Sequence, residues 1–290
     1  MLFQRTLKNS IEFNGIGVHS GQACKIIIKP AAENTGIIFK KIGDDSCGSN
    51  SFVSANYDNV IDTRLCTVIG DGTLKFSTIE HLMSALWGVG IDNAIIECSS
   101  EELAIMDGSS APFVETLEAV GVVEQKSSPR KYLKILKETI IEEGGKFVKL
   151  SPSDVTSYKC SIDFDHPSIG YQEIVFEPHL SDYKREVSYA RTFGFASEIE
   201  ELKQMGLARG GSLENAVGVD EHGVMNPEGL RYYNEFVRHK LLDLIGDLFL
   251  TGYRFIAKIE GHKCGHYLNN MVLKKLFATP ENFTFVELKN

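Results

Sequence analysis

The sequence lacks the features of several protein classes. Its most apolar segment, LLDLIGDLFL, is interrupted by Asp243 and Asp247, so it falls far short of the roughly 20 apolar residues of a membrane span. The first residues, MLFQRTLKNSIEF, contain no apolar core of a secretory signal peptide. Six cysteines occur without a Cys-x-x-Cys pair, which excludes a zinc ribbon and gives no sign of a disulfide scaffold. We therefore expect a cytoplasmic protein with reduced thiols.

Positive charge is also scarce. The chain has 30 Lys and Arg against 39 Asp and Glu, which gives a net charge of −9. Nucleic acid is an unfavourable partner for such a surface because its binding depends on phosphate neutralisation. A small anionic ligand remains compatible if a few cations converge locally, and nothing implies an obligate protein partner.

The length of 290 residues suffices for two domains. The polar segment QKSSPR at 125–130 is typical of a linker, so we expect a first domain over 1–125 and a second over 131–290. Glycines are frequent between 188 and 226, which indicates an inserted subdomain at about 193–226.

Apolar periodicity predicts the main elements. Gly144-Gly145 predicts a hairpin turn between two strands. Each half of the chain has strands followed by a helix that carries a histidine, EHLMSALWGVG and RHKLLDLIGDL. We therefore predict an α+β fold of two similar domains with a site between them. The expected strands are 21–30, 35–42 and 94–98, and the expected helices are 78–88, about 110–121 and about 230–250.

The helix expected at about 230–250 carries three polar residues on one face. His239, Asp243 and Asp247 recur every four residues, so their side chains project in the same direction. A His and an Asp one turn apart can bind one metal ion. The alternative is a His–Asp hydrogen bond on a solvated helix face, which is the more common use of such a pair.

The helix expected at 78–88 carries Glu80 and His81 near its start. Ser77 to Glu80 also fits a capping box, in which Glu80 would only satisfy a backbone N–H. In the functional interpretation, His81 joins His239 and Asp243 as a third ligand, which leaves a zinc position open for water. Glu80 would then take the proton of that water.

The loop GHKCGHYLNN adds two more histidines, His262 and His266. A histidine near a metal-bound amide is suited to protonating the amine leaving group. Asp247, one turn beyond Asp243, is placed to hold such an imidazole in its charged form. The alternative is that both histidines are exposed loop residues.

These segments, read together, resemble the UDP-3-O-acyl-N-acetylglucosamine deacetylases, zinc enzymes of lipid A biosynthesis. The resemblance extends over essentially the whole chain. It implies a β-α-α-β sandwich, Zn²⁺ on His81, His239 and Asp243, Glu80 as general base, and His266 as general acid oriented by Asp247. The segments that carry it are GIGVHSG, TIEHLMSALWGVGIDN, IMDGSSAPF, DFDHPSIG, ARTFGF, RGGSLENA, EFVRHKLLDLIGDL and HKCGHYLNN.

The resemblance also implies contacts with an acylated UDP-sugar substrate. Thr192 in ARTFGF is similar to a threonine that stabilises the oxyanion. Further residues are similar to ones that contact the sugar, diphosphate or uridine: His19, Phe164, Phe193, Lys240 and Lys263. One departure is Leu207-Ala208-Arg209, which puts a charge in the segment that lines the acyl passage in the family.

The resemblance implies hydrolysis of the 2-acetamido group of that sugar, with release of acetate. Two alternatives stay open: hydrolysis of another acylated sugar or small amide, and non-catalytic binding of a nucleotide sugar or acyl group. Two His and one carboxylate also suit Fe(II). The amphiphilic product leaves transient contact with a membrane surface open.

Overall fold

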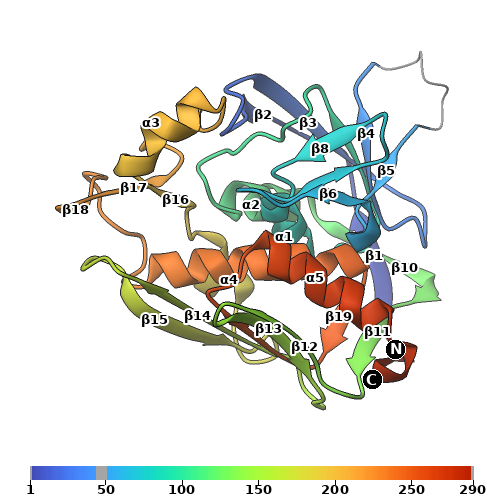
Figure 1. Cartoon of the computed structure of the whole chain (residues 1–290). Coiled ribbons are helices and arrows are strands. Elements are labelled where there is room, and N and C mark those ends of the chain that lie inside the picture. Colours follow the sequence, from blue (N-terminus) through green and yellow to red (C-terminus); the bar gives the residue numbers. More distant parts are fainter. Residues whose placement is uncertain (1, 44–50, 289–290) are drawn as a thin grey trace.

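The computed structural model describes residues 2–43 and 51–288. Two five-stranded sheets enclose a layer of helices, and a small subdomain projects from one side (Figure 1). Of the six cysteines, five are buried and free, and Cys47 lies outside the described residues. No described helix is long and apolar enough to cross a membrane.

The first half of the chain supplies one outer sheet and two helices of the middle layer. The sheet has the strand order β2-β3-β9-β4-β5, and a smaller sheet has the order β6-β7-β8. The elements are β1 (Phe3–Leu7), β2 (Ile11–Ile16), β3 (Ala23–Pro30), β4 (Ile37–Lys41), β5 (Val53–Ser54), η2 (Tyr57–Asn59), β6 (Val60–Asp62), β7 (Val68–Gly70), β8 (Lys75–Ser77), α1 (Glu80–Val89), β9 (Ala94–Cys98), α2 (Ala111–Val120) and β10 (Val122–Pro129).

The second half supplies the opposite sheet, of order β12-β13-β20-β14-β15, and a three-stranded sheet, β19-β11-β21. The elements are β11 (Lys131–Ile135), β12 (Thr139–Glu143), β13 (Lys146–Ser151), β14 (Ser157–Phe164), β15 (Gly170–Phe176), η3 (Lys184–Ser188), β16 (Phe193–Phe195), α3 (Ala196–Gln204), β17 (Val217–Asp220), β18 (Gly223–Val224), α4 (Glu235–Leu248), η4 (Phe249–Thr251), β19 (Arg254–Ile256), β20 (Lys258–His262), α5 (His266–Phe277), η5 (Pro280–Asn282) and β21 (Phe283–Glu287).

The two large sheets repeat one topology. In each, two antiparallel pairings precede one parallel pairing, and a last antiparallel pairing closes the sheet. α1 and α4 lie between the sheets and are almost wholly buried. The predicted α+β fold with two similar sheets around paired helices is confirmed.

The local predictions hold where apolar periodicity is strong. Helices α1 and α2 lie at the expected positions. Gly144 and Gly145 form the hairpin turn between β12 and β13 with φ of 58° and 77°, values that glycine adopts without steric cost. Residues 193–226 fold as β16, α3, β17 and β18, the projecting subdomain in Figure 1.

Two segments differ in structure from what the sequence indicated. Most of residues 125–130 continue β10, which pairs with β1, so the predicted linker is a paired strand, and the division into 1–125 and 131–290 stays a prediction. Their polar side chains bond to neighbouring segments, as Gln125 does to the Ala31 carbonyl. Helix α4 begins at Glu235 and not at 230. The preceding chain is held in turns because the Arg231 N–H donates to the Glu235 carboxylate.

Candidate active site

The crossing of α1 and α4 brings together the polar residues of both helices. Gly246 makes this crossing close. A Cβ at that position would lie 2.1 Å from the Glu80 carbonyl oxygen, a distance that real side chains do not tolerate. Glu80 and His81 in the first turn of α1 therefore face the polar stripe of α4, with His239, Asp243 and Asp247 all buried.

His81, His239 and Asp243 form a compact cluster. One candidate ligand atom from each lies within 4.8 Å of the others. Asp243 Oδ1 is 3.7 Å from His81 Nε2 and 3.4 Å from His239 Nε2. This oxygen is buried and has no hydrogen-bond donor among the residues that the structure describes. An anionic oxygen without a donor, between two imidazole nitrogens, suits a cation and is unfavourable without one.

The protonation of the cluster also suits a metal. Burial lowers the pKa of His81 to about 3, with a further contribution from His239, and burial lowers the pKa of His239. Both rings are therefore neutral near pH 7 and offer a lone pair. His239 Nδ1 lies 3.1 Å from the Ala190 carbonyl, so it carries the proton and leaves Nε2 as the ligand atom.

Lys240 lies beside the cluster without joining it. Its Nζ donates to Asp243 Oδ2 at 2.9 Å. Burial opposes ionisation of Asp243, but His239 and Lys240 hold the pKa of this carboxyl below its usual range. The lysine thus keeps Asp243 charged and occupies the oxygen that points away from the histidines.

Glu80 is not a capping residue. Helix α1 has no side-chain hydrogen bond at its N-cap, which is Ile79. Instead, Glu80 Oε2 accepts the Thr67 N–H at 3.0 Å, so the capping-box alternative was wrong. Burial raises the pKa of Glu80 to about 7. A carboxyl with this pKa can gain and lose a proton near neutral pH.

His266 and Asp247 form a buried pair opposite Glu80. His266 Nδ1 lies 2.8 Å from Asp247 Oδ2, and His266 Nε2 lies 3.8 Å from Glu80 Oε1. Burial alone would lower the pKa of His266, but the Asp247 and Glu80 carboxylates outweigh it and raise the value to about 10. The imidazole is therefore charged near pH 7 and presents an N–H toward Glu80. His266 is not an exposed loop residue, because it begins α5 and is 8% exposed.

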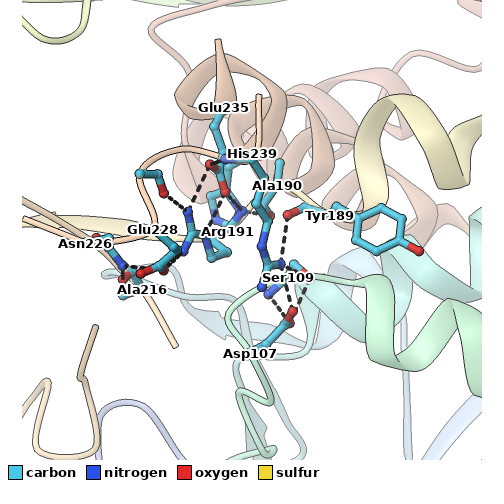
Figure 2. A network of polar contacts seen from close by, with 12 residues as sticks. Asp107, Ser109, Tyr189, Ala190, Arg191, Ala216, Asn226, Glu228, Glu235 and His239 are labelled. Atoms are coloured by element: carbon cyan, nitrogen blue, oxygen red, sulfur yellow. Dashed lines mark hydrogen bonds and ion pairs between the residues drawn. The ribbon is translucent and has the colours of Figure 1, made fainter. Parts of the chain in front are cut away.

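The segment before β16 is tied to α4 by a buried ion pair (Figure 2). The Arg191 N–H and Nε both donate to Glu235 Oε1 at 2.9 Å, and neither side chain is more than 2% exposed. Glu235 lies one turn before His239 on α4, and Ala190 bonds His239 directly. Arg191 therefore fixes both the carbonyl that orients His239 and the position of Thr192.

Two cavities adjoin this centre, one at Glu80 and His81 and the other at His266. One, of about 400 Å³, is largely apolar and runs between the β16–β18 subdomain and the loop that follows β2. The other, of about 520 Å³, lies beside Lys263 and His266. Leu65 lines both. The apolar cavity is bordered by Ile105, Phe193, Ile199, Leu202, Leu213, Val217 and Met225, among others.

The expectation that Arg209 places its charge in this apolar cavity was wrong. Ala208 is buried and lines the cavity, but Arg209 is exposed and does not line it. Ala208 has a φ of 52°, and the Arg209 N–H donates to the His19 carbonyl. This turn directs the guanidinium away from the cavity.

The remaining predicted residues lie around the same centre. His19, Thr192 and Phe193 line the apolar cavity with Glu80 and His81. Phe164 lines neither cavity, but its ring centroid lies 5.7 Å from those of Phe193 and Phe195. Lys263 lines the second cavity and pairs with Asp163 at 3.2 Å.

Several contact residues escaped the sequence analysis. Thr67 bonds both Glu80 and Asp247, and Asn269 donates to Asp247. The Glu102 carboxylate accepts the His19 and Ser20 N–H groups at 2.7 Å and so fixes the loop after β2. Asn269 lies in the quoted segment HKCGHYLNN but was not singled out, and no spacing rule pointed to the others.

A buried His–His–Asp centre beside a carboxylate and a charged imidazole, between two layers of an α+β fold, is typical of metal-assisted hydrolases. Residues 4–278 match the model of the UDP-3-O-acyl N-acetylglycosamine deacetylases, and the chain belongs to this family. Its members hydrolyse an amide.

Curated relatives agree over nearly the whole chain. A UDP-3-O-acyl-N-acetylglucosamine deacetylase of Acidithiobacillus ferrooxidans is 46% identical over 99% of this chain and 94% of its own length. Proteins of the same name from Chromobacterium violaceum and Legionella pneumophila are 44% and 42% identical, over 98% and 100% of this chain and 93% and 95% of their own lengths.

Proposed function

We propose that this chain hydrolyses the 2-acetamido group of UDP-3-O-acyl-N-acetylglucosamine, giving the free amine and acetate, with zinc on His81, His239 and Asp243. This is the committed step of lipid A biosynthesis. The observation that carries the proposal is the donor-free Asp243 Oδ1 between two neutral imidazoles, with Glu80 and His266 beside it. A bound zinc ion supplies a Lewis acid for a carbonyl oxygen and acidifies water.

The side chains divide the acid and base work. Glu80 accepts the proton of the attacking water, since its pKa of about 7 allows it to be ionised. The Thr192 hydroxyl donates to the oxyanion that develops on the amide. His266, charged and held by Asp247, protonates the departing amine.

The two cavities are proposed to bind different parts of the substrate. The apolar cavity suits the 3-O-acyl chain, which gains free energy by leaving water. The second cavity carries Lys263 and suits the anionic diphosphate. His19 and Phe193 line the apolar cavity, and Phe164 and Lys240 lie against the Phe193 ring. All four are proposed substrate contacts.

The test is mass spectrometry of the products formed from UDP-3-O-acyl-N-acetylglucosamine, with zinc content measured on the same samples. Glu80→Gln is expected to lower turnover by about 100-fold or more and to retain zinc. His239→Ala is expected to lose both turnover and bound zinc. Glu12→Gln, at an exposed position on β2, is the control and should behave as wild type.

Two outcomes would contradict the proposal. Wild-type turnover in Glu80→Gln would rule out Glu80 as the general base. Tight binding of the sugar without product in zinc-loaded wild-type protein would instead indicate a nucleotide-sugar binding protein.

A further inference from the structure

Thr67 joins the two carboxylates that face His266. Its backbone N–H donates to Glu80 Oε2 at 3.0 Å, and its hydroxyl donates to Asp247 Oδ1 at 2.5 Å. The residue is 2% exposed. One residue thus contacts a side chain of α1 and a side chain of α4, on either side of the imidazole.

The local fold holds Thr67 in this place. It directly precedes β7, and β7 pairs with β8 so that Val68 lies opposite Ser77, three residues before Glu80. The loop before it is fixed because Asp62 Oδ1 accepts the N–H groups of Thr63 and Arg64. Thr67 is therefore already in position before any ligand binds.

We propose that Thr67 is a positioning residue, whose N–H and hydroxyl fix Glu80 and Asp247 relative to each other and so keep His266 Nε2 opposite Glu80 Oε1. The inference rests on the proposed function and adds to it a residue outside the helix motifs. Asp247 Oδ2 is shared by His266 and Asn269. Oδ1 accepts the Thr67 hydroxyl, so that bond controls the rotation of the carboxylate.

Loss of the hydroxyl should change the pKa of the Asp247–His266 pair in a defined direction. A hydroxyl that donates to a carboxylate stabilises its charged form. Without this bond, the Asp247–His266 pair binds its shared proton more tightly and releases it at higher pH. Glu80 keeps its bond, because the backbone N–H remains. The other titratable groups around His266 stay in place: Asp243 and His239 on α4, Glu80 and His81 on α1, and His19 from the loop after β2.

The experiment compares Thr67→Val, Thr67→Ser and Thr6→Val with wild type. Thr6 is a matched control, since its buried hydroxyl bonds the Asn93 carbonyl in another part of the first domain. For Thr67→Val we expect kcat to fall about tenfold with KM unchanged, which corresponds to the loss of one charge-assisted hydrogen bond. The alkaline limb of the pH profile should move up by about half a unit, with the acidic limb unmoved. Thr67→Ser should have the wild-type kcat and the wild-type alkaline limb.

A second measurement does not depend on substrate. NMR titration of the His266 ring in metal-free protein should show the same upward shift in Thr67→Val, even if the deacetylase assignment fails. If Thr67→Val does not fold, Thr67→Cys replaces it, because its thiol is a weaker donor, and an intermediate shift is expected. Wild-type kcat and pH limbs in a folded Thr67→Val protein, or a loss of kcat with both limbs and the His266 titration unmoved, would overturn the proposal.

Discussion

At the scale of single residues, four of the functional groups are held through one polar atom and keep the other available, whereas His81 Nδ1 is buried with no partner among the described residues. Lys240 takes one Asp243 oxygen and leaves Oδ1 without a donor. The same arrangement recurs at His239 with Ala190, at Glu80 with Thr67 and at His266 with Asp247. Such partners fix orientation before substrate binds, which is the condition for electrostatic catalysis.

Replacement of Asp247 by Asn tests the pair with His266. The pKa of His266 is about 10, and the Asp247 carboxylate is the largest of the effects that raise it. Removal of that charge lowers the pKa, so the charged acid is lost at lower pH. We expect the alkaline limb of kcat/KM to move down by at least one unit in Asp247→Asn, opposite to the shift in Thr67→Val. An unmoved limb would contradict His266 as the acid.

The helix spacing predicted the residues that share one element but not their partners. His239 and Asp243 could be placed on one face because helical geometry is local. Thr67 could not be found in this way, since it lies 180 residues from Asp247 in the sequence. Its bond depends on how the segment before β7 packs against α4, which no local pattern encodes.

At the scale of elements, the close crossing of α1 and α4 builds the site. Gly246 permits it, and the Ser84 N also lies only 3.1 Å from a Cβ at that position. Gly246→Ala would force the helices apart, although alanine favours a helix. We expect a loss of about 1–3 kcal/mol in the free energy of unfolding and a marked fall in kcat as Glu80 and His81 move away from α4. Denaturant unfolding and steady-state assays measure the two effects, and wild-type values for both would contradict this role.

The predicted boundaries of helices and strands were accurate where the apolar pattern is strong. Helices α1 and α2 and the β12–β13 hairpin were predicted because their apolar spacing and glycines are local signals. β10 was missed because it is polar and largely exposed, and pairs with β1 more than 110 residues earlier. The start of α4 was missed because Arg231 bonds Glu235 and Asp107 in place of continuing the helix.

At the scale of the whole molecule, two sheets of equal topology support one centre between them. One continuous hydrophobic core extends through both halves of the chain, so metal-free protein should remain folded. Zinc at about 100 times its Kd should stabilise it by about 2.7 kcal/mol, seen as a rise of several degrees in Tm. In His239→Ala this rise should disappear. An equal rise in both proteins would place the ion elsewhere.

Acetate release from UDP-3-O-acyl-N-acetylglucosamine by metal-stripped protein, titrated with zinc, tests the central claim most directly. The account predicts that activity returns to a maximum near one zinc per chain, since the described residues offer one buried His–His–Asp group. No acetate at any zinc level, from protein shown to be folded, would contradict it.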